Sequence, residues 1–287
     1  MDGILCIDKP QGLTSRDVVN EVGKTFHTKK IGHTGTLDPL ATGVLVLCMG
    51  SCSKLAELLT ATEKEYEAEM ILGIETDTLD VTGTLLKEET VSFTQTEIET
   101  VLKRFVGTYE QEVPAYSAVK VQGKKLYELA RQGKKVELPK RVVQIRSLDL
   151  LSFRREGVNF YVEFRTTVSK GTYIRSLIRD IAAALHTVGV MSKLRRTRQG
   201  TFSLADCSTL ETLKAGSYHL LTKEEVFQDM PKVIMSQELK WRVQNGQLLD
   251  RGLFQPPVFF VNDSGELKAI YQLYEKDETK IKPWKMF

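Results

Sequence analysis

The apolar positions of the first fifty residues predict a short strand, an amphipathic helix and a buried strand. Residues 4–7 form an apolar run that is typical of a strand and that ends at a turn over residues 9–12. Beyond this turn Ser15 can cap a helix. Residues 44–48 are uncharged and rich in β-branched side chains, which indicates a buried strand. The apolar residues on one face of the helix are Val18, Val19, Val22 and Phe26.

A strand and a helix follow in the next part of the chain. Residues 66–72 alternate apolar and acidic side chains, as a strand with one solvated face does. Thr94 and Glu97 form a capping box, which predicts the start of a helix. The apolar residues that continue this helix are Ile98, Val101, Leu102 and Phe105.

The second half of the chain predicts two long strands that follow one another directly. These strands, residues 142–153 and 158–168, are joined near residues 155–157, and the second alternates strictly. Such neighbours favour an antiparallel or mixed sheet over alternating strands and helices. Residues 172–186 then predict a helix with one apolar face. We therefore expect an α+β fold with a central mixed, mostly antiparallel sheet flanked by helices.

The pattern of apolar and polar residues changes at Pro231. Residues 258–261 and 267–274 predict two strands, and the turn-rich residues 262–265 suit a hairpin between them. We therefore expect a large domain over residues 1–230 and a small β-rich module over residues 231–287.

Composition places the chain among globular proteins, with 287 residues of which 41% are hydrophobic and 27% charged. Acids on both sides of the first apolar run are wrong for a secretory leader, and no stretch is apolar and long enough to span a bilayer. We therefore expect a cytoplasmic location. The four cysteines, at 6, 48, 52 and 207, fit neither a disulfide framework nor a zinc site. They predict buried thiols and no metal.

Positive charge is concentrated in two segments, although the net charge is only +3. Residues 120–141 hold eight Lys or Arg against two Glu, interleaved with tyrosine and glycine, inside an apparent insertion over residues 113–141 with its own small helix. The second cluster comprises Lys193, Arg195, Arg196 and Arg198. Each cluster alone is compatible with a solvated face, but two together favour a polyanionic partner. The cations of the first segment are Lys120, Lys124, Lys125, Arg131, Lys134, Lys135, Lys140 and Arg141.

The run of residues 32–43, GHTGTLDPLATG, holds one imidazole, His33, and one carboxylate, Asp38, in a glycine-rich loop. Glycine permits close approach of a partner, and an Asp followed by proline fixes a sharp turn. The run is compatible with a structural turn or with a catalytic carboxylate. Another pair of acids, Asp77 and Asp80, is compatible with a turn or with magnesium ligands of a nuclease.

Arg175 lies at the border of the apolar stripe of the helix over residues 172–186. It is compatible with a surface arginine whose stem covers the core, or with a partner that would hold Asp38 ionised and oriented. Tyr66 and Tyr173 are equally compatible with packing or with stacking on a ligand.

Four motifs together resemble the bacterial TruB family of tRNA pseudouridine synthases. They are residues 9–15 (KPQGLTS), 32–43, 116–120 (YSAVK) and 169–175 (SKGTYIR). The resemblance runs in order from Lys9 to about Phe202, and the tail from Pro231 resembles the PUA-type RNA-binding module more loosely. One departure is Val113, where many relatives have proline.

The resemblance implies the pseudouridine synthase fold and an isomerase that converts uridine 55 in the T-loop of tRNA to pseudouridine without a cofactor. Asp38 would be the essential carboxylate, either as a nucleophile or as a base, and Arg175 its ion-pair partner. Tyr66 would stack on the flipped uracil, and Tyr173 would line the pocket and move a proton. His33 would contact the RNA, and Leu194 would close the pocket.

The resemblance also implies tRNA as the partner, with the T-arm held by residues 113–141 and the acceptor stem reached by the C-terminal module. We expect no obligate protein partner and a monomer. The residues expected on the RNA backbone are Lys9, Lys120, Lys124, Arg195 and Arg196. A non-catalytic RNA-binding or tRNA-folding protein and a guide-RNA-dependent synthase remain alternative interpretations.

Overall fold

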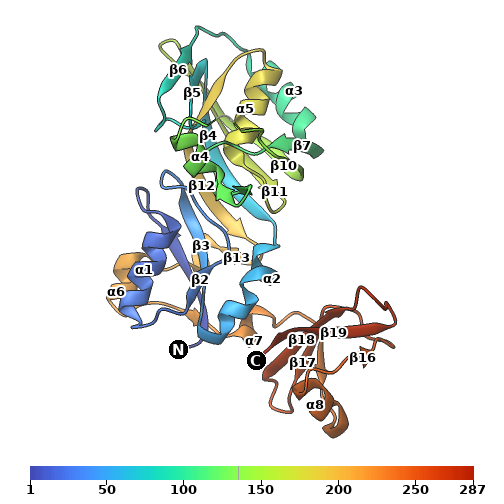
Figure 1. Ribbon diagram of the computed structural model, residues 1–287. Coiled ribbons are helices and arrows are strands. Elements are labelled where there is room, and N and C mark those ends of the chain that lie inside the picture. Colours follow the sequence, from blue (N-terminus) through green and yellow to red (C-terminus); the bar gives the residue numbers. More distant parts are fainter. Residues whose placement is uncertain (135) are drawn as a thin grey trace.

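The computed structural model describes residues 1–134 and 136–287 and contains two large β-sheets, two two-stranded hairpins and the helices around them (Figure 1). The large sheet has ten strands in the order β14-β1-β3-β12-β4-β11-β10-β7, with β2 beside β3 and β13 beside β12. Its longest strands are β1 (Gly3–Lys9), β3 (Thr42–Met49), β4 (Lys64–Leu72), β10 (Lys140–Glu156), β11 (Asn159–Val168) and β12 (Gly189–Gln199). The shorter ones are β2 (Ile31–His33), β7 (Gly107–Glu112), β13 (Phe202–Ser203) and β14 (Leu220–Leu221).

The α+β prediction is confirmed, because helices flank this sheet and almost all of its pairings are antiparallel. Within the described residues its one parallel ladder joins β3 to β12, through Thr42 with Arg195 and Gly43 with Arg196. The helices are α1 (Ser15–Thr25), α2 (Ala56–Thr60), α3 (Gln95–Phe105), α5 (Ile174–Ala184), α6 (Leu210–Lys214) and α7 (Lys223–Val226), with a 3-10 turn at Gly50–Leu55 and another at Leu204–Asp206.

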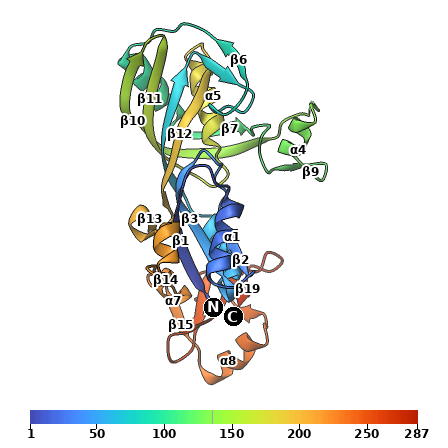
Figure 2. The ribbon, with the colours of Figure 1, turned by 90° about the vertical axis from the view of Figure 1, so that its left-hand side faces the viewer.

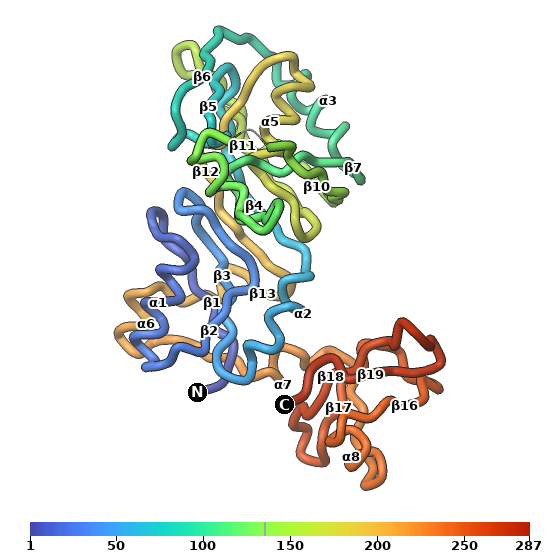
Figure 3. The backbone as a smooth tube through the Cα atoms, in the orientation of Figure 1, coloured from blue at the N-terminus to red at the C-terminus, as the bar shows by residue number. Residues whose placement is uncertain are grey.

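The parallel ladder is the seam between two halves of the large sheet. Figure 3 shows the chain build the lower half with β1 to β3, enter the upper half through β4 and return through β12. A two-stranded hairpin of β5 (Ile74–Thr76) and β6 (Leu85–Glu88) extends the upper half. The seam therefore places residues from both halves beside one another.

Strand β3 is uniformly apolar because both faces of the sheet are buried there. Leu45, Leu47 and Met49 pack into a core with α1 and α5, whereas Val44, Val46 and Cys48 pack into a second core on the other face. The buried strand predicted over residues 44–48 is thus confirmed. All four cysteines carry free thiols, and three of them are buried.

The second sheet, β15-β17-β18-β19-β16, lies between Lys232 and Met286, so a β-rich C-terminal module is confirmed. Its Phe259 and Ile270 belong to the second core, in which Phe227, just after α7, lies between the module and the residues of β1 and β3. The expected hairpin over residues 258–274 is present. The elements of this region are β15 (Lys232–Ile234), α8 (Gln237–Gln244), β16 (Leu249–Asp250), β17 (Val258–Val261), β18 (Leu267–Leu273) and β19 (Lys280–Met286).

The basic insertion projects from the side of the molecule (Figure 2). It contains a short hairpin of β8 (Lys120–Val121) and β9 (Lys124–Lys125) followed by α4 (Leu126–Arg131), which confirms the predicted small helix. Lys120 and Lys124 are exposed on the hairpin. Lys135, part of the same predicted cluster, lies outside the described residues.

Two local predictions differ from the structure. Helix α1 is capped by Thr14, whose hydroxyl accepts from the Asp17 amide, and not by Ser15. Ser15 is buried and its hydroxyl binds the backbone of Leu37 instead. The basic cluster at 193–198 belongs to β12, for which no strand was predicted, because its charged residues interrupt the apolar pattern. No helix among the described residues is long and apolar enough to cross a membrane.

We predict that Gly43→Ala destabilises the protein far more than Gly12→Ala. Both glycines have positive φ, +101° and +91° respectively. A Cβ at Gly43 would lie within 3.0 Å of three backbone atoms of Arg196, whereas a Cβ at Gly12 would meet nothing within 4 Å. Urea unfolding should show a loss of about 1–2 kcal/mol for Gly12→Ala and of more than about 4 kcal/mol for Gly43→Ala. Equal losses would contradict the close approach of β3 and β12.

Candidate active site

The loop between β2 and β3, which carries Asp38, is held by hydrogen bonds at each end. The Thr34 amide donates to Val46 O at 3.0 Å, and the Leu37 amide donates to Ser15 Oγ at 2.8 Å. The Gly12 amide donates to Pro39 O at 2.8 Å, which ties the turn before α1 to the same loop. The Asp-Pro turn is therefore fixed before any ligand binds.

Lys9 is fully buried beneath this loop, contrary to its expected place on the RNA backbone. Its ammonium donates to Pro10 O at 2.8 Å, Leu13 O at 2.7 Å and Pro39 O at 3.5 Å. Burial lowers its pKa to about 8, while the charge of Asp38 opposes that shift. The motif lysine thus joins the first turn to the Asp38 loop and is not available to a phosphate.

Arg175 reaches Asp38 from the first turn of α5, so the pair expected from the sequence is present. Arg175 Nη2 lies 2.9 Å from Asp38 Oδ2, and the arginine is 6% exposed while the carboxylate is 37% exposed. The guanidinium also donates to Thr78 O and to Tyr116 O, each at 2.9 Å. Asp38 is thereby oriented by a buried cation and still open to a ligand.

Asp77 and Asp80 belong to the turn between β5 and β6, which also supplies the Thr78 carbonyl that accepts from Arg175. Asp80 Oδ2 lies 4.0 Å from Arg175 Nη1, and its Oδ1 accepts from Thr78 Oγ1 at 3.0 Å and from the Thr82 amide at 3.0 Å. Asp77 accepts from the Thr84 amide and from the Tyr116 hydroxyl. In the described residues no three His, Cys, Asp or Glu side chains gather as metal ligands. The hydrogen bonds of both carboxylates support the structural interpretation of this turn.

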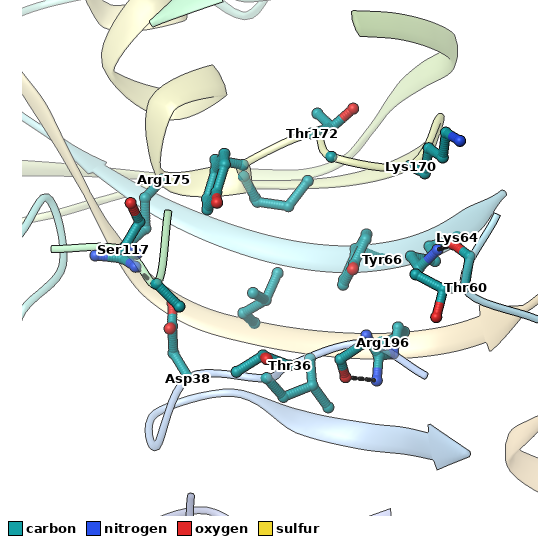
Figure 4. Close-up of a pocket in the computed structure, with 17 residues that line it drawn as sticks. Thr36, Asp38, Thr60, Lys64, Tyr66, Ser117, Lys170, Thr172, Arg175 and Arg196 are labelled. Atoms are coloured by element: carbon teal, nitrogen blue, oxygen red, sulfur yellow. Dashed lines mark hydrogen bonds and ion pairs between the residues drawn. The ribbon is translucent and has the colours of Figure 1, made fainter. Parts of the chain in front are cut away.

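A cavity of about 260 Å³ opens beside the ion pair (Figure 4). Tyr66 on β4, Tyr173 at the start of α5 and Leu194 on β12 line it, and all three are half-buried or buried. Tyr66 is 7% and Leu194 8% exposed, so each presents one surface to the cavity. Burial raises the pKa of Tyr173, which keeps its hydroxyl protonated at neutral pH. The cavity therefore combines the Asp38–Arg175 ion pair with two phenols and the apolar side chain of Leu194.

Other residues of the cavity were not found by the sequence analysis. Lys64, at the start of β4, is 7% exposed and lines the cavity, as do Lys170 and the buried Ser117. Arg196, expected on the RNA backbone, is 1% exposed and lines the cavity as well. A buried lysine before an alternating strand leaves no signal in the sequence, but the YSAVK motif does mark Ser117.

The remaining candidate residues lie outside the cavity lining. His33 ends β2, and its Nδ1 is buried without a hydrogen-bond partner among the described residues. Burial, together with the charges of Arg16 and Arg196, lowers the pKa of His33, so the neutral imidazole is favoured. Arg195 forms an ion pair with Asp8 at 2.7 Å on the outer face of β12. None of these contacts involves the Asp38–Arg175 pair.

The fold is similar to solved pseudouridine synthase structures. A chain of the structure titled "Crystal Structure of a Cbf5-Nop10-Gar1 Complex" matches with a TM-score of 0.68 and 27% identity, covering 94% of this chain and 78% of that one. A chain of "Structure of H/ACA RNP bound to a substrate RNA containing 2'-deoxyuridine" matches with a TM-score of 0.68 and 25% identity, covering 99% and 84%. The architecture is therefore that of the pseudouridine synthases.

Sequence comparisons show to which group of pseudouridine synthases the chain is most similar. Residues 23–174 match the N-terminal domain of the TruB family pseudouridylate synthases, and residues 175–239 match the tRNA pseudouridylate synthase B C-terminal domain. A tRNA pseudouridine synthase B of Geobacillus thermodenitrificans is 42% identical over the full length of both chains. A protein of the same name from Alkaliphilus oremlandii is 45% identical over 86% of this chain and 82% of that one. The chain belongs to the TruB family of pseudouridylate synthases.

We predict that the stability of the wild type relative to Lys9→Met increases as the pH rises from about 8 to 10.5. The unfolded chain binds more protons than the folded one in this range, because the pKa of Lys9 falls from 10.5 to about 8 on folding. The free energy of unfolding of the wild type should gain up to about 3 kcal/mol over the variant. Urea unfolding of both proteins at pH 7.5 and 10.5 measures this, and every other titrating group is common to both. A constant difference would contradict burial of a charged Lys9.

Proposed function

We propose that this chain converts uridine 55 in the T-loop of tRNA to pseudouridine, with the target uracil flipped into the cavity beside Asp38. The observation that carries the proposal is the Asp38–Arg175 pair at one end of a cavity walled by Tyr66 and Leu194. The similarity to proteins named tRNA pseudouridine synthase B supports tRNA as the substrate. The specific uridine rests on the motif resemblance.

The reaction breaks the bond between N1 and C1′, rotates the uracil and forms a bond between C5 and C1′. One proton leaves C5 and one is gained at N1, so no oxidant and no leaving product is required. Asp38 would act at the sugar or the base as a nucleophile, or would remove a ribose proton as a base. Both roles require the carboxylate to be ionised and fixed, which the buried guanidinium of Arg175 favours.

Tyr66 and Leu194 would hold the flipped uracil between them. Flipping a nucleotide costs a few kcal/mol, and stacking on one aromatic ring returns about 1–3 kcal/mol. Tyr173, whose hydroxyl stays protonated, would donate a hydrogen bond or a proton at the C5 step. His33, whose neutral imidazole is half-buried, would contact the RNA next to the flipped base.

Phosphate contacts would supply the remaining binding energy. Lys120 and Lys124 are exposed on the projecting insertion, where they can reach a stem. Arg195 would join them after exchanging Asp8 for a phosphate. The C-terminal module would extend the contact toward the acceptor stem. We infer a monomer in the cytoplasm, and a division of the chain at residue 231 between the catalytic domain and this module.

A guide-RNA-dependent synthase is the second candidate, because the solved structures similar to this fold include a complex with partner proteins and an RNA-protein particle bound to substrate RNA. Conversion of bare tRNA by the purified chain would exclude it. A non-catalytic tRNA-folding role predicts instead that tRNA folding assays are unaffected by replacement of Asp38. Both measurements use the full chain.

We predict that Asp38→Asn abolishes conversion but retains RNA binding. The amide preserves the size of the side chain and removes the charge that a nucleophile or base requires. The measurement is release of tritium from tRNA labelled at C5 of uracil, together with filter binding of the same RNA. Turnover of Asp38→Asn near the wild-type rate would disprove the central role of Asp38.

We predict that Arg175→Ala lowers the single-turnover rate by at least about 100-fold, with a smaller loss of affinity for tRNA. The reason is that the variant leaves Asp38 without the cation that orients it. Arg179→Ala is the matched control, because Arg179 is on the same helix but pairs with Glu112 away from Asp38. A single-turnover rate equal to that of the control would remove Arg175 from the reaction.

A further inference from the structure

The cavity beside Asp38 carries more positive charge than a neutral uracil needs. Its charged lining residues are one carboxylate, Asp38, and four cations. Arg175 is paired with Asp38, which leaves Lys64, Lys170 and Arg196 at the other end. Figure 4 shows Tyr66 between the ion pair and this second group.

Two of these three cations are buried without a charged partner. Lys64 is 7% and Arg196 1% exposed, and neither forms an ion pair with any residue that the structure describes. Lys and Arg are almost never fully buried unless paired, because removal of a charge from water is costly. An anionic ligand would supply the missing charge.

The protein contacts of the two cations are all to neutral carbonyls. Lys64 Nζ donates to Thr60 O at 2.9 Å and to Thr62 O at 2.7 Å, next to the end of α2. Arg196 Nε donates to Val44 O at 2.6 Å and Nη2 to Gly35 O at 3.2 Å, whereas Nη1 has no acceptor within the described part of the chain. These bonds fix both cations and leave donors for a ligand.

The electrostatics agree with this arrangement. Burial lowers the pKa of Lys64 to about 8, and the neighbouring charges of Arg196 and Lys170 lower it further in the same direction. Lys64 is therefore close enough to each of the other two cations to be repelled by it. Lysine and arginine together, at a fixed place beside a nucleotide pocket, are the usual ligands of a phosphate.

We propose that Lys64, Arg196 and Lys170 form a phosphate site that binds one of the two phosphodiesters flanking the flipped uridine. The proposal rests on the proposed function, because it takes the cavity as the uracil site. Since the cations and Asp38 line the same cavity, the bound phosphate lies within one nucleotide of the reacting sugar. The site would hold the backbone at a fixed distance from Asp38 while the base turns.

The test replaces each flanking phosphate in a T-arm stem-loop by a neutral methylphosphonate. Binding is measured with proteins that carry Asp38→Asn, so that the RNA is not converted. With Lys64 and Lys170 intact, one of the two replacements should weaken binding about tenfold. In the Lys64→Met or Lys170→Gln protein the same methylphosphonate should weaken RNA binding less than about threefold, because the charge that recognises the phosphate is gone.

Each of these variants should also reduce the salt dependence of binding, by about 0.7 in the slope of log K against log salt concentration. If Lys64 had a purely structural role, Lys64→Met would lower the melting temperature of the protein. It would then leave unchanged both the methylphosphonate effect and the slope of log K against log salt concentration. Lys170 is exposed, so Lys170→Gln decides the question if Lys64→Met does not fold.

Lys193→Gln is the matched control, because Lys193 is on the same strand as Arg196 but is paired with Glu69 at 3.2 Å, outside the cavity lining. This variant should keep the full tenfold effect of the methylphosphonate. Equal methylphosphonate effects in all four proteins at both linkages would overturn the phosphate site. Tritium release by the chain with Asp38 intact is measured separately, so failure of the proposed function is distinguished from failure of this inference.

Discussion

The buried guanidinium of Arg175 is the interaction on which the arrangement of the site depends. It binds one carboxylate and two main-chain carbonyls, and these belong to the Asp38 loop, the turn before β6 and the inserted segment. No other residue type provides several fixed donors in one plane together with a permanent charge. Three segments that are far apart in the sequence therefore meet at one side chain.

The position of Arg175 depends in turn on the packing of the sheet. Helix α5 packs its apolar face, with Leu177, Ile178 and Ile181, into the core beneath the large sheet. The Asp38 loop is set by β3, which lies against β12 only because Gly43 has no side chain. Asp38 and Arg175 are thus placed by elements from the two halves of the sheet, with the seam between them.

The sequence predicts those features whose physical cause is local. The capping box at Thr94, the alternation over residues 158–168 and the uniform apolar run over residues 44–48 each correspond to an element of the structure. The Asp38–Arg175 pair could also be anticipated, because Arg175 sits at the edge of an apolar helix face and Asp38 is the one acid of its loop. Their roles in the reaction stay proposals.

Features with a tertiary cause could not be predicted in this way. Lys9 and Arg196 have the residue types of a solvated surface, yet each is buried and donates to a main-chain carbonyl of a distant segment, Pro39 O for Lys9 and Val44 O for Arg196. Lys64 is hidden by the end of α2, which precedes it in the chain but folds over it. Strand β12 alternates charged and apolar residues irregularly, since even its inward face carries an arginine.

The shared core between the C-terminal module and strands β1 and β3 has a consequence for substrate selection. A module on a free linker could change its distance from the cavity, whereas one whose Phe259 is buried in the core shared with the large domain is held in one place. Under the proposed function, an RNA that contacted both the module and the cavity would need a matching span, so its folded dimensions would be selected along with its bases.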